Sequence, residues 1–175
     1  MPNTSRGYPY PLLTDAPDGP AQIKALADAL NADVGSLAAA TTGAWTTYTG
    51  PLQALATNPT MGNSVIRAAY KRVGNTVAFY YHVTVGTTFA AGGGAYLIPL
   101  PVPMSWNALA MDMPIGSGMV GQYAGRRGLI VSAYDTASRA LLVRSDTGAA
   151  LDSGGVLAAW AAGEHIAASG TYEAA

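Results

Sequence analysis

Apolar residues recur at spacings of three and four after Pro20, and this spacing predicts one amphipathic helix. Pro20 suits the first turn, where its missing N–H would have no helical partner. Gly35 is a natural end, so we predict a helix over residues 20–35. Its apolar stripe consists of Ile23, Leu26, Leu30, Val34 and Leu37. A helix of about four turns is marginal alone in water. The stripe therefore needs a partner, either the rest of the chain or copies of itself.

The segment before this helix is rich in proline, with Pro9, Pro11 and Pro17 in a short stretch. Proline fixes φ and removes a backbone donor, which excludes a helix or a central strand. We expect residues 1–19 to form an extended arm that docks on another protein. Its candidate docking residues are Arg6, Tyr8, Pro9, Tyr10, Pro11, Leu12 and Leu13.

Residues 36–44 are mostly alanine, threonine and glycine, and we expect them to form a linker. With an arm on one side and a linker on the other, the helix would stand alone. For this reason we favour self-association of the stripe over contact with the rest of the chain.

From Trp45 onward the hydrophobic period changes to two, which is typical of strands. Residues 64–72 and 76–85 are expected to be two strands of a hairpin, joined at Gly74 and Asn75, residue types that tolerate positive φ. In the second strand one face collects the apolar residues Val77, Phe79, Tyr81, Val83 and Val85.

Several more short strands follow, separated by turn residues. They are expected at residues 95–100, 119–123, 128–134, 139–144 and 165–172, with an irregular stretch over 101–114. Short strands at this spacing favour an antiparallel β-sandwich or jelly-roll-like domain over residues 45–175. The predicted fold class is mainly β, with an extended N-terminal arm and a short oligomerising α-helix.

The composition sharpens this picture. Half of the 175 residues are hydrophobic and only 11% are charged, so the free surface of one copy would be poorly charged and prone to association. The net charge of −1 argues against nucleic-acid binding, which needs a basic face. No apolar run approaches the roughly 18 residues of a membrane span, and we expect no membrane insertion.

The sequence offers little that could carry catalysis. There is no cysteine, and the ten acidic residues are scattered, so neither a thiolate nor an oxygen-ligand metal site is indicated. Gly116-Ser117-Gly118 lacks the preceding glycine of a nucleophile elbow. His82 and His165 stand singly in predicted strands, and we interpret them as surface or interface residues rather than metal ligands or bases. We expect a non-enzymatic protein with no catalytic residue, no metal and no cofactor.

Three residues are candidates for contact with a receptor. Trp106 lies in the proline-flanked irregular stretch and is either exposed or part of the core. Arg126 and Arg127 form a small basic spot between two glycines. This spot suits an anionic glycan or a neighbouring subunit, although a simple solvated pair is the more ordinary interpretation.

The opening segment Tyr8–Leu30, with its tyrosine–proline start and Thr14–Gly19 motif before a helix, resembles virion fibre and minor tail proteins of phages of actinobacteria. Further similarity lies in Trp45–Thr49, in the hairpin Tyr70–Val77 and in the closing Ser169–Glu173. The resemblance touches both ends and the first hairpin, about a third of the chain.

This resemblance implies a non-enzymatic virion structural protein, assembled in the cytoplasm of a bacterial host. Such fibres are usually homotrimers in which the arm docks on a larger virion protein and a C-terminal β knob faces outward, with a host-surface glycan as candidate receptor. The short helix leaves a capsid decoration protein or head fibre as an alternative to a tail fibre. A free carbohydrate-binding module, which would be a stable monomer, is a second alternative. A glycan-cleaving enzyme with two converging carboxylates is a third.

Overall fold

A computed structural model describes residues 3–12, 14, 18–42, 44–105, 113–121, 125–135, 138–152 and 160–175. The chain divides into two compact units, Met1–Ala44 and Trp45–Ala175. The boundary coincides with the change of hydrophobic period in the sequence. In the described part of the chain, no helix has the length and apolar character needed to cross a membrane.

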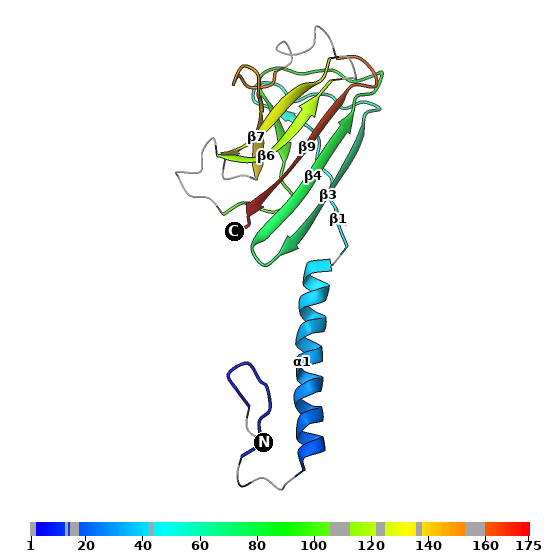
Figure 1. Cartoon of the computed structure of the whole chain (residues 1–175). Helices are drawn as coiled ribbons and strands as arrows, with labels where there is room; N and C mark the ends of the chain where they lie inside the picture. The colour runs from blue at the N-terminus through cyan, green and yellow to red at the C-terminus, as the bar shows by residue number, and fades with distance from the viewer. Residues whose placement is uncertain are drawn as a thin grey trace. The chain divides into compact units, whose positions relative to one another are not determined.

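The first unit contains the helix α1, Gly19–Thr42 (Figure 1). Asp18 caps its start, because its carboxylate oxygen accepts a hydrogen bond from the Ala21 N–H at 3.1 Å. The expected end at Gly35 is wrong, and residues 36–42 of the expected linker are helical. Twenty-four residues at a rise of about 1.5 Å each give a helix of roughly 36 Å, longer than the sequence indicated.

The reason for the longer helix lies in the residues after Gly35. A single glycine costs a helix about 1 kcal/mol relative to alanine. The following run Ala38–Ala40 consists of alanine, the residue type with the highest helix propensity, and it favours continuation of the helix. The hydroxyl groups of Ser36 and Thr42 donate hydrogen bonds to the carbonyl oxygens four residues earlier, at 3.0 and 2.6 Å. These residues thus satisfy their polar groups without leaving the helix.

The arm is not extended throughout, because residues 3–9 reverse direction. The Thr4 N–H donates to the Tyr8 carbonyl oxygen at 2.8 Å, and Asn3 pairs with Pro9 in an isolated antiparallel bridge. Gly7 has a φ of +84°, which a side chain would disfavour, and it permits this reversal. Prolines excluded regular structure here, but they did not exclude a tight turn.

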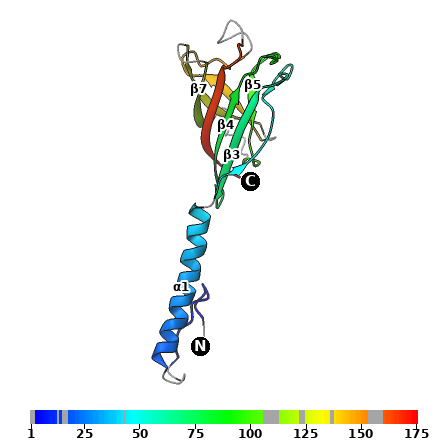
Figure 2. The same cartoon turned by 90° about the vertical axis from the view of Figure 1, so that its right-hand side faces the viewer.

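The second unit is built on one curled antiparallel sheet, as Figures 1 and 2 show. Its described strands are β1 (Thr46–Thr47), β2 (Gln53–Ala54), β3 (Val65–Val73), β4 (Thr76–Thr84), β5 (Tyr96–Pro99), β6 (Pro114–Val120), β7 (Arg127–Asp135), β8 (Arg139–Arg144) and β9 (His165–Glu173). They follow the spatial order β1-β3-β4-β9-β6-β7-β8-β5-β2. The predicted mainly-β class with one helix is confirmed.

The predicted hairpin is also confirmed. β3 and β4 pair along their whole length, and Val73 faces Thr76 across the turn. Gly74 takes a φ of +59°, whereas Asn75 is not among the residues with positive φ. Only the first turn residue therefore uses the left-handed region that the sequence pattern suggested for both.

β6 differs from the prediction. It was expected to begin near Met119, yet it begins at Pro114 and includes Gly116 and Gly118. Glycine weakens a strand in general. Here the neighbouring strand β9 lies so close that a side-chain carbon on Gly116 would stand 2.1 Å from the carbonyl oxygen of Ser169. The two glycines are thus required by a backbone approach that becomes visible only in three dimensions.

The core lies on the inner face of the curled sheet. The apolar face predicted for β4 is buried, since each of its five residues is at most 2% exposed. It packs with residues from the other half of the sheet, including Ile98, Leu129, Val131 and Leu142. The two layers expected of a sandwich are thus supplied by the two halves of one sheet.

Candidate functional site

The first candidate site is the apolar stripe of α1. Its five residues have exposed fractions from 40% for Leu26 to 71% for Ile23, with Leu30, Val34 and Leu37 in between. Such exposure is unusual for aliphatic side chains in line on one helix face. The predicted seam residues therefore share one face, and within their own unit this face is largely open to solvent.

The arm lies along one edge of the stripe and the helix side next to it. The Tyr8 hydroxyl donates a hydrogen bond to Asp33 Oδ2 at 2.5 Å, and this bond raises the pKa of Tyr8. Half-buried Gln22, Ala25 and Ala29 lie along the same side as Asp33. At 3.6 residues per turn, this side is about a quarter turn away from the centre of the stripe.

A small hollow lies where the arm and the stripe meet. It is lined by Pro9, Tyr10, Pro11, Gly19, Gln22, Ile23 and Leu26. Of the other predicted docking residues, Arg6 and Leu12 are exposed, and Leu13 lies outside the described residues. Tyr8 and Pro9 are half-buried, which means that part of the predicted docking surface already serves the chain's own helix.

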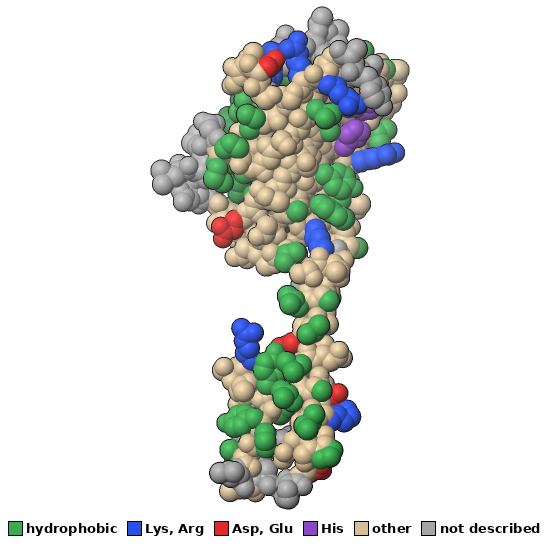
Figure 3. All heavy atoms as spheres, viewed as in Figure 1, with side chains coloured by type: hydrophobic (Ala, Val, Ile, Leu, Met, Phe, Trp, Pro, Cys, Tyr) green, Lys and Arg blue, Asp and Glu red, His purple; other side chains and the backbone are tan. Residues whose placement is uncertain are grey.

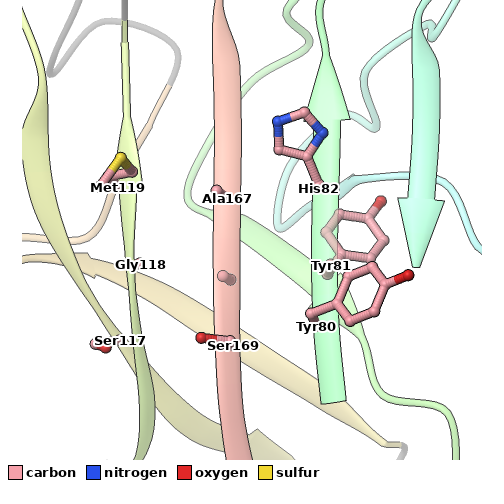
Figure 4. Close-up of a pocket in the computed structure, with 9 residues that line it drawn as sticks. Tyr80, Tyr81, His82, Ser117, Gly118, Met119, Ala167 and Ser169 are labelled. Atoms are coloured by element: carbon pink, nitrogen blue, oxygen red, sulfur yellow. The ribbon is translucent and has the colours of Figure 1, made fainter. Parts of the chain in front are cut away.

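The second candidate site is a shallow groove on the outer face of the sheet, over β4, β9 and β6 (Figure 4). Two rows of residues paired across the three strands form it. The rows are His82–Ala167–Met119 and Tyr80–Ser169–Ser117. Because the middle strand contributes only a methyl and a hydroxymethyl group, the larger side chains on either side stand above a low floor. The groove has a volume of about 390 Å³.

Tyr80 forms an aromatic edge of the groove, and it contacts Trp45, which does not itself line the groove. Tyr80 is 40% exposed, and its ring lies 5.4 Å from that of Trp45, which is 49% exposed. Neither residue was selected as a receptor contact from the sequence. Strand alternation would have placed Tyr80 opposite the buried Tyr81, and that parity is the signal that could have identified it.

The two histidines come together beside this edge. Their rings stack, with centroids 5.2 Å apart and planes inclined by 25°. His82 pairs in register with Ala167 and His165 with Thr84, so the two side chains are diagonal neighbours on adjacent strands. Thr84 Oγ1 lies 3.2 Å from His165 Nδ1. The interpretation of both as single, separate residues is therefore corrected.

Burial, and then the nearby His165 and Arg67, lower the pKa of His82, so its imidazole is neutral at pH 7. A pair of histidines is a fragment of a metal site. Within the described residues, however, no group of three or more His, Asp or Glu side chains is placed to hold a metal ion. His82 lines the groove, and the His165 ring stacks against it.

The predicted basic spot is partly neutralised. Arg127 Nη1 lies 2.9 Å from Asp146 Oδ2, and Arg144 contacts both oxygens of the same carboxylate at 2.8 and 3.0 Å. The bonds from Arg144 and then Arg127 lower the pKa of Asp146 to about 2. Arg126 and Arg127 share a hollow of about 370 Å³ with Asp146. Trp106 lies outside the described residues.

Two of the acidic residues in the described part of the chain are held by contacts within the fold. Asp146 is held by two arginines, and buried Glu164 accepts a hydrogen bond from the Ala161 N–H at 3.2 Å, closing a turn. Asp112 lies outside the described residues. Asp146 and Glu164 therefore both take part in contacts within the fold.

Comparison with known proteins gives no further guidance, because no family model matches this chain and neither a curated protein nor a solved structure matches it.

Proposed function

We propose that this protein is a non-enzymatic structural subunit of a phage virion, a short trimeric tail fibre or spike. The observation that carries the proposal is the open apolar stripe of α1. An amphipathic helix gains most of its stability by burying its apolar face. Here that face extends over residues 23–37 and its side chains are 40–71% exposed.

Sister copies are the simplest partner for this stripe. Ile23, Leu30 and Leu37 are seven residues apart, which is the repeat of a coiled-coil seam. Leu26 occupies the second seam position. In the following repeat this position falls on Asp33, at the edge of the stripe, where the carboxylate accepts the hydrogen bond from Tyr8 of the arm. A single polar residue at such a position sets register and copy number at some cost in stability. The number three itself comes from the resemblance to fibre proteins.

The arm supplies the attachment to a larger virion protein in this proposal. Tyr10, Pro11 and Leu12 remain exposed when the arm lies on its own helix, and they offer an apolar surface without regular structure. Docking would use these exposed arm residues, while Leu30, Val34 and Leu37 of the stripe, which do not line the hollow beside the arm, stay available to the sister copies.

The test separates assembly from attachment. The purified full chain should have the mass of three copies in light scattering. Deleting residues 1–17, which keeps the Asp18 cap of α1, should preserve that mass and abolish incorporation into particles. A monomeric full chain would contradict the assembly role, and continued incorporation of the shortened chain would contradict the docking role.

Two of the alternatives each have a discriminating observation. A capsid decoration protein or head fibre has the same chemistry at another location, and imaging of labelled particles would distinguish it. A free carbohydrate-binding module is favoured by the groove on the sheet, and it predicts a monomer that is indifferent to loss of residues 1–44.

A further inference from the structure

The groove over β4, β9 and β6 presents polar groups that have no partner in the described part of the chain. They are the Tyr80 hydroxyl, the His82 imidazole and the hydroxyl groups of Ser117 and Ser169. In Figure 4 the Tyr80 ring stands at the edge of the groove and points away from β9, while His82 and the two serines lie on the side of β9 and β6. Neutral imidazole and hydroxyl groups each donate and accept hydrogen bonds. The groove therefore suits a ligand that is rich in groups of the same kind.

Charge narrows the class of ligand. None of the residues that line the groove is Asp, Glu, Lys or Arg. On the face of the second unit seen in Figure 3, charged side chains are sparse over the central strands. The charged residue paired with His82 is Arg67, on the side away from β9. A strongly anionic or cationic ligand would lose its hydration here without finding a counter-charge.

The aromatic side chains beside the groove further restrict the class of ligand. Tyr80 and Trp45 offer exposed rings whose faces favour a flat, partly apolar surface. A sugar ring combines such a surface of C–H groups with hydroxyls on its edge. We propose that this groove binds a neutral saccharide unit, with its ring against Tyr80 and its hydroxyls toward Ser117, Ser169 and His82.

The openness of the groove sets the size of the ligand. A floor of Ala167 and Ser169 between low walls cannot enclose a free monosaccharide, so one unit within or at the end of a longer glycan fits better. A role of the groove as a receptor site depends on the proposed function in host attachment. Binding of a sugar in the groove does not depend on it.

The binding experiment uses the full chain and defined neutral oligosaccharides of glucose, galactose, mannose, rhamnose and N-acetylglucosamine. Saturation-transfer NMR and calorimetry should detect at least one of them with a dissociation constant near or below about 1 mM, the range expected of a single open subsite. The glucuronate analogue of the best ligand should bind more weakly. Absence of binding for every sugar at about 20 mM would overturn the proposal.

Variants locate the site. Tyr80→Ala should weaken binding about tenfold or more, and Ala167→Leu, which fills the floor, should abolish it. Val73→Ala is the matched control, because Val73 is also 40% exposed in the same hairpin and does not line the groove. Unchanged affinity in both groove variants would place the sugar elsewhere and overturn the assignment.

The same samples distinguish this proposal from the proposed function. Sugar binding by a monomer would support the groove and contradict the fibre role. A trimer that enters particles but binds no sugar would support the fibre role and contradict the saccharide proposal. If Ala167→Leu changes the number of copies while no sugar binds, the groove is a contact between copies and the saccharide proposal is wrong.

Discussion

Replacing Leu30 by aspartate tests the central idea that α1 is a seam between copies. Leu30 lies in the middle of the stripe and is 43% exposed in the single chain. Full burial of a leucine is worth about 2 kcal/mol, so covering the remaining surface contributes about 0.9 kcal/mol per copy and about 2.6 kcal/mol in a trimer. Each buried carboxylate adds a penalty of several kcal/mol. We expect Leu30→Asp to abolish a micromolar trimer.

The assay is light scattering together with circular dichroism. Three copies of 17.8 kDa should fall to one. The helical signal should fall as well, because α1 would lose the packing of its apolar face, which supplies most of a helix's stability. Asn31→Asp is the matched control, since it adds the same charge one residue away, outside the stripe, and should leave both signals unchanged. A Leu30→Asp protein with unaltered mass and helicity would refute the seam.

Three further predictions concern the second unit, each measured by urea unfolding at fixed protein concentration. Tyr81→Phe should lower the free energy of unfolding by about 1–3 kcal/mol, because it removes the 2.9 Å hydrogen bond from the Tyr81 hydroxyl to the Gly50 carbonyl oxygen. Tyr48→Phe should leave the stability unchanged or raise it, because the buried Tyr48 hydroxyl has no hydrogen-bond partner among the described residues. Equal losses would contradict the hydrogen-bond argument. Gly116→Ala should lower the free energy of unfolding by about 1–3 kcal/mol, because the added methyl group clashes with β9. Gly93→Ala is the control and should change the stability little, because a methyl group there meets nothing within 4 Å. An unchanged stability of Gly116→Ala would mean that β9 can move away. The paired carboxylate of Asp146 stabilises the fold above its ordinary pKa of 3.8, and this contribution disappears as the pH falls toward about 2. Asp146→Asn should remove that part of the acid dependence, and an identical acid profile would show that the arginine contacts are not maintained in solution.

The hydrophobic pattern was sufficient for the local elements. Alternation along residues 77–85 identified the buried face of β4, and Gly74 identified the turn before it. The stripe of α1 followed from spacings of three and four. These features depend on contacts between residues close in the chain, and their side-chain direction follows from backbone geometry alone.

The ends of elements were less predictable. Gly35 was expected to stop the helix, but helix-favouring alanines after it outweigh the cost of one glycine. Prolines in the arm excluded regular structure and still allowed the turn at Gly7. At Gly35 a helix-ending residue competes with helix-favouring neighbours, and in the arm the prolines compete with a glycine that permits a turn. The sequence pattern alone does not determine which of the two tendencies is stronger.

The groove, in contrast, was decided by tertiary structure. The sequence determined that Tyr80 and His82 lie on the face of β4 opposite its buried side chains. It did not determine that β9 lies between β4 and β6, which places Ser169 beside Tyr80, Ser117 on the far side of Ser169, and His165 against His82. Strand order depends on the closure of long loops and on the burial of a core to which all strands contribute. Both depend on contacts between residues that are far apart in the chain, so a local pattern of residues cannot predict them.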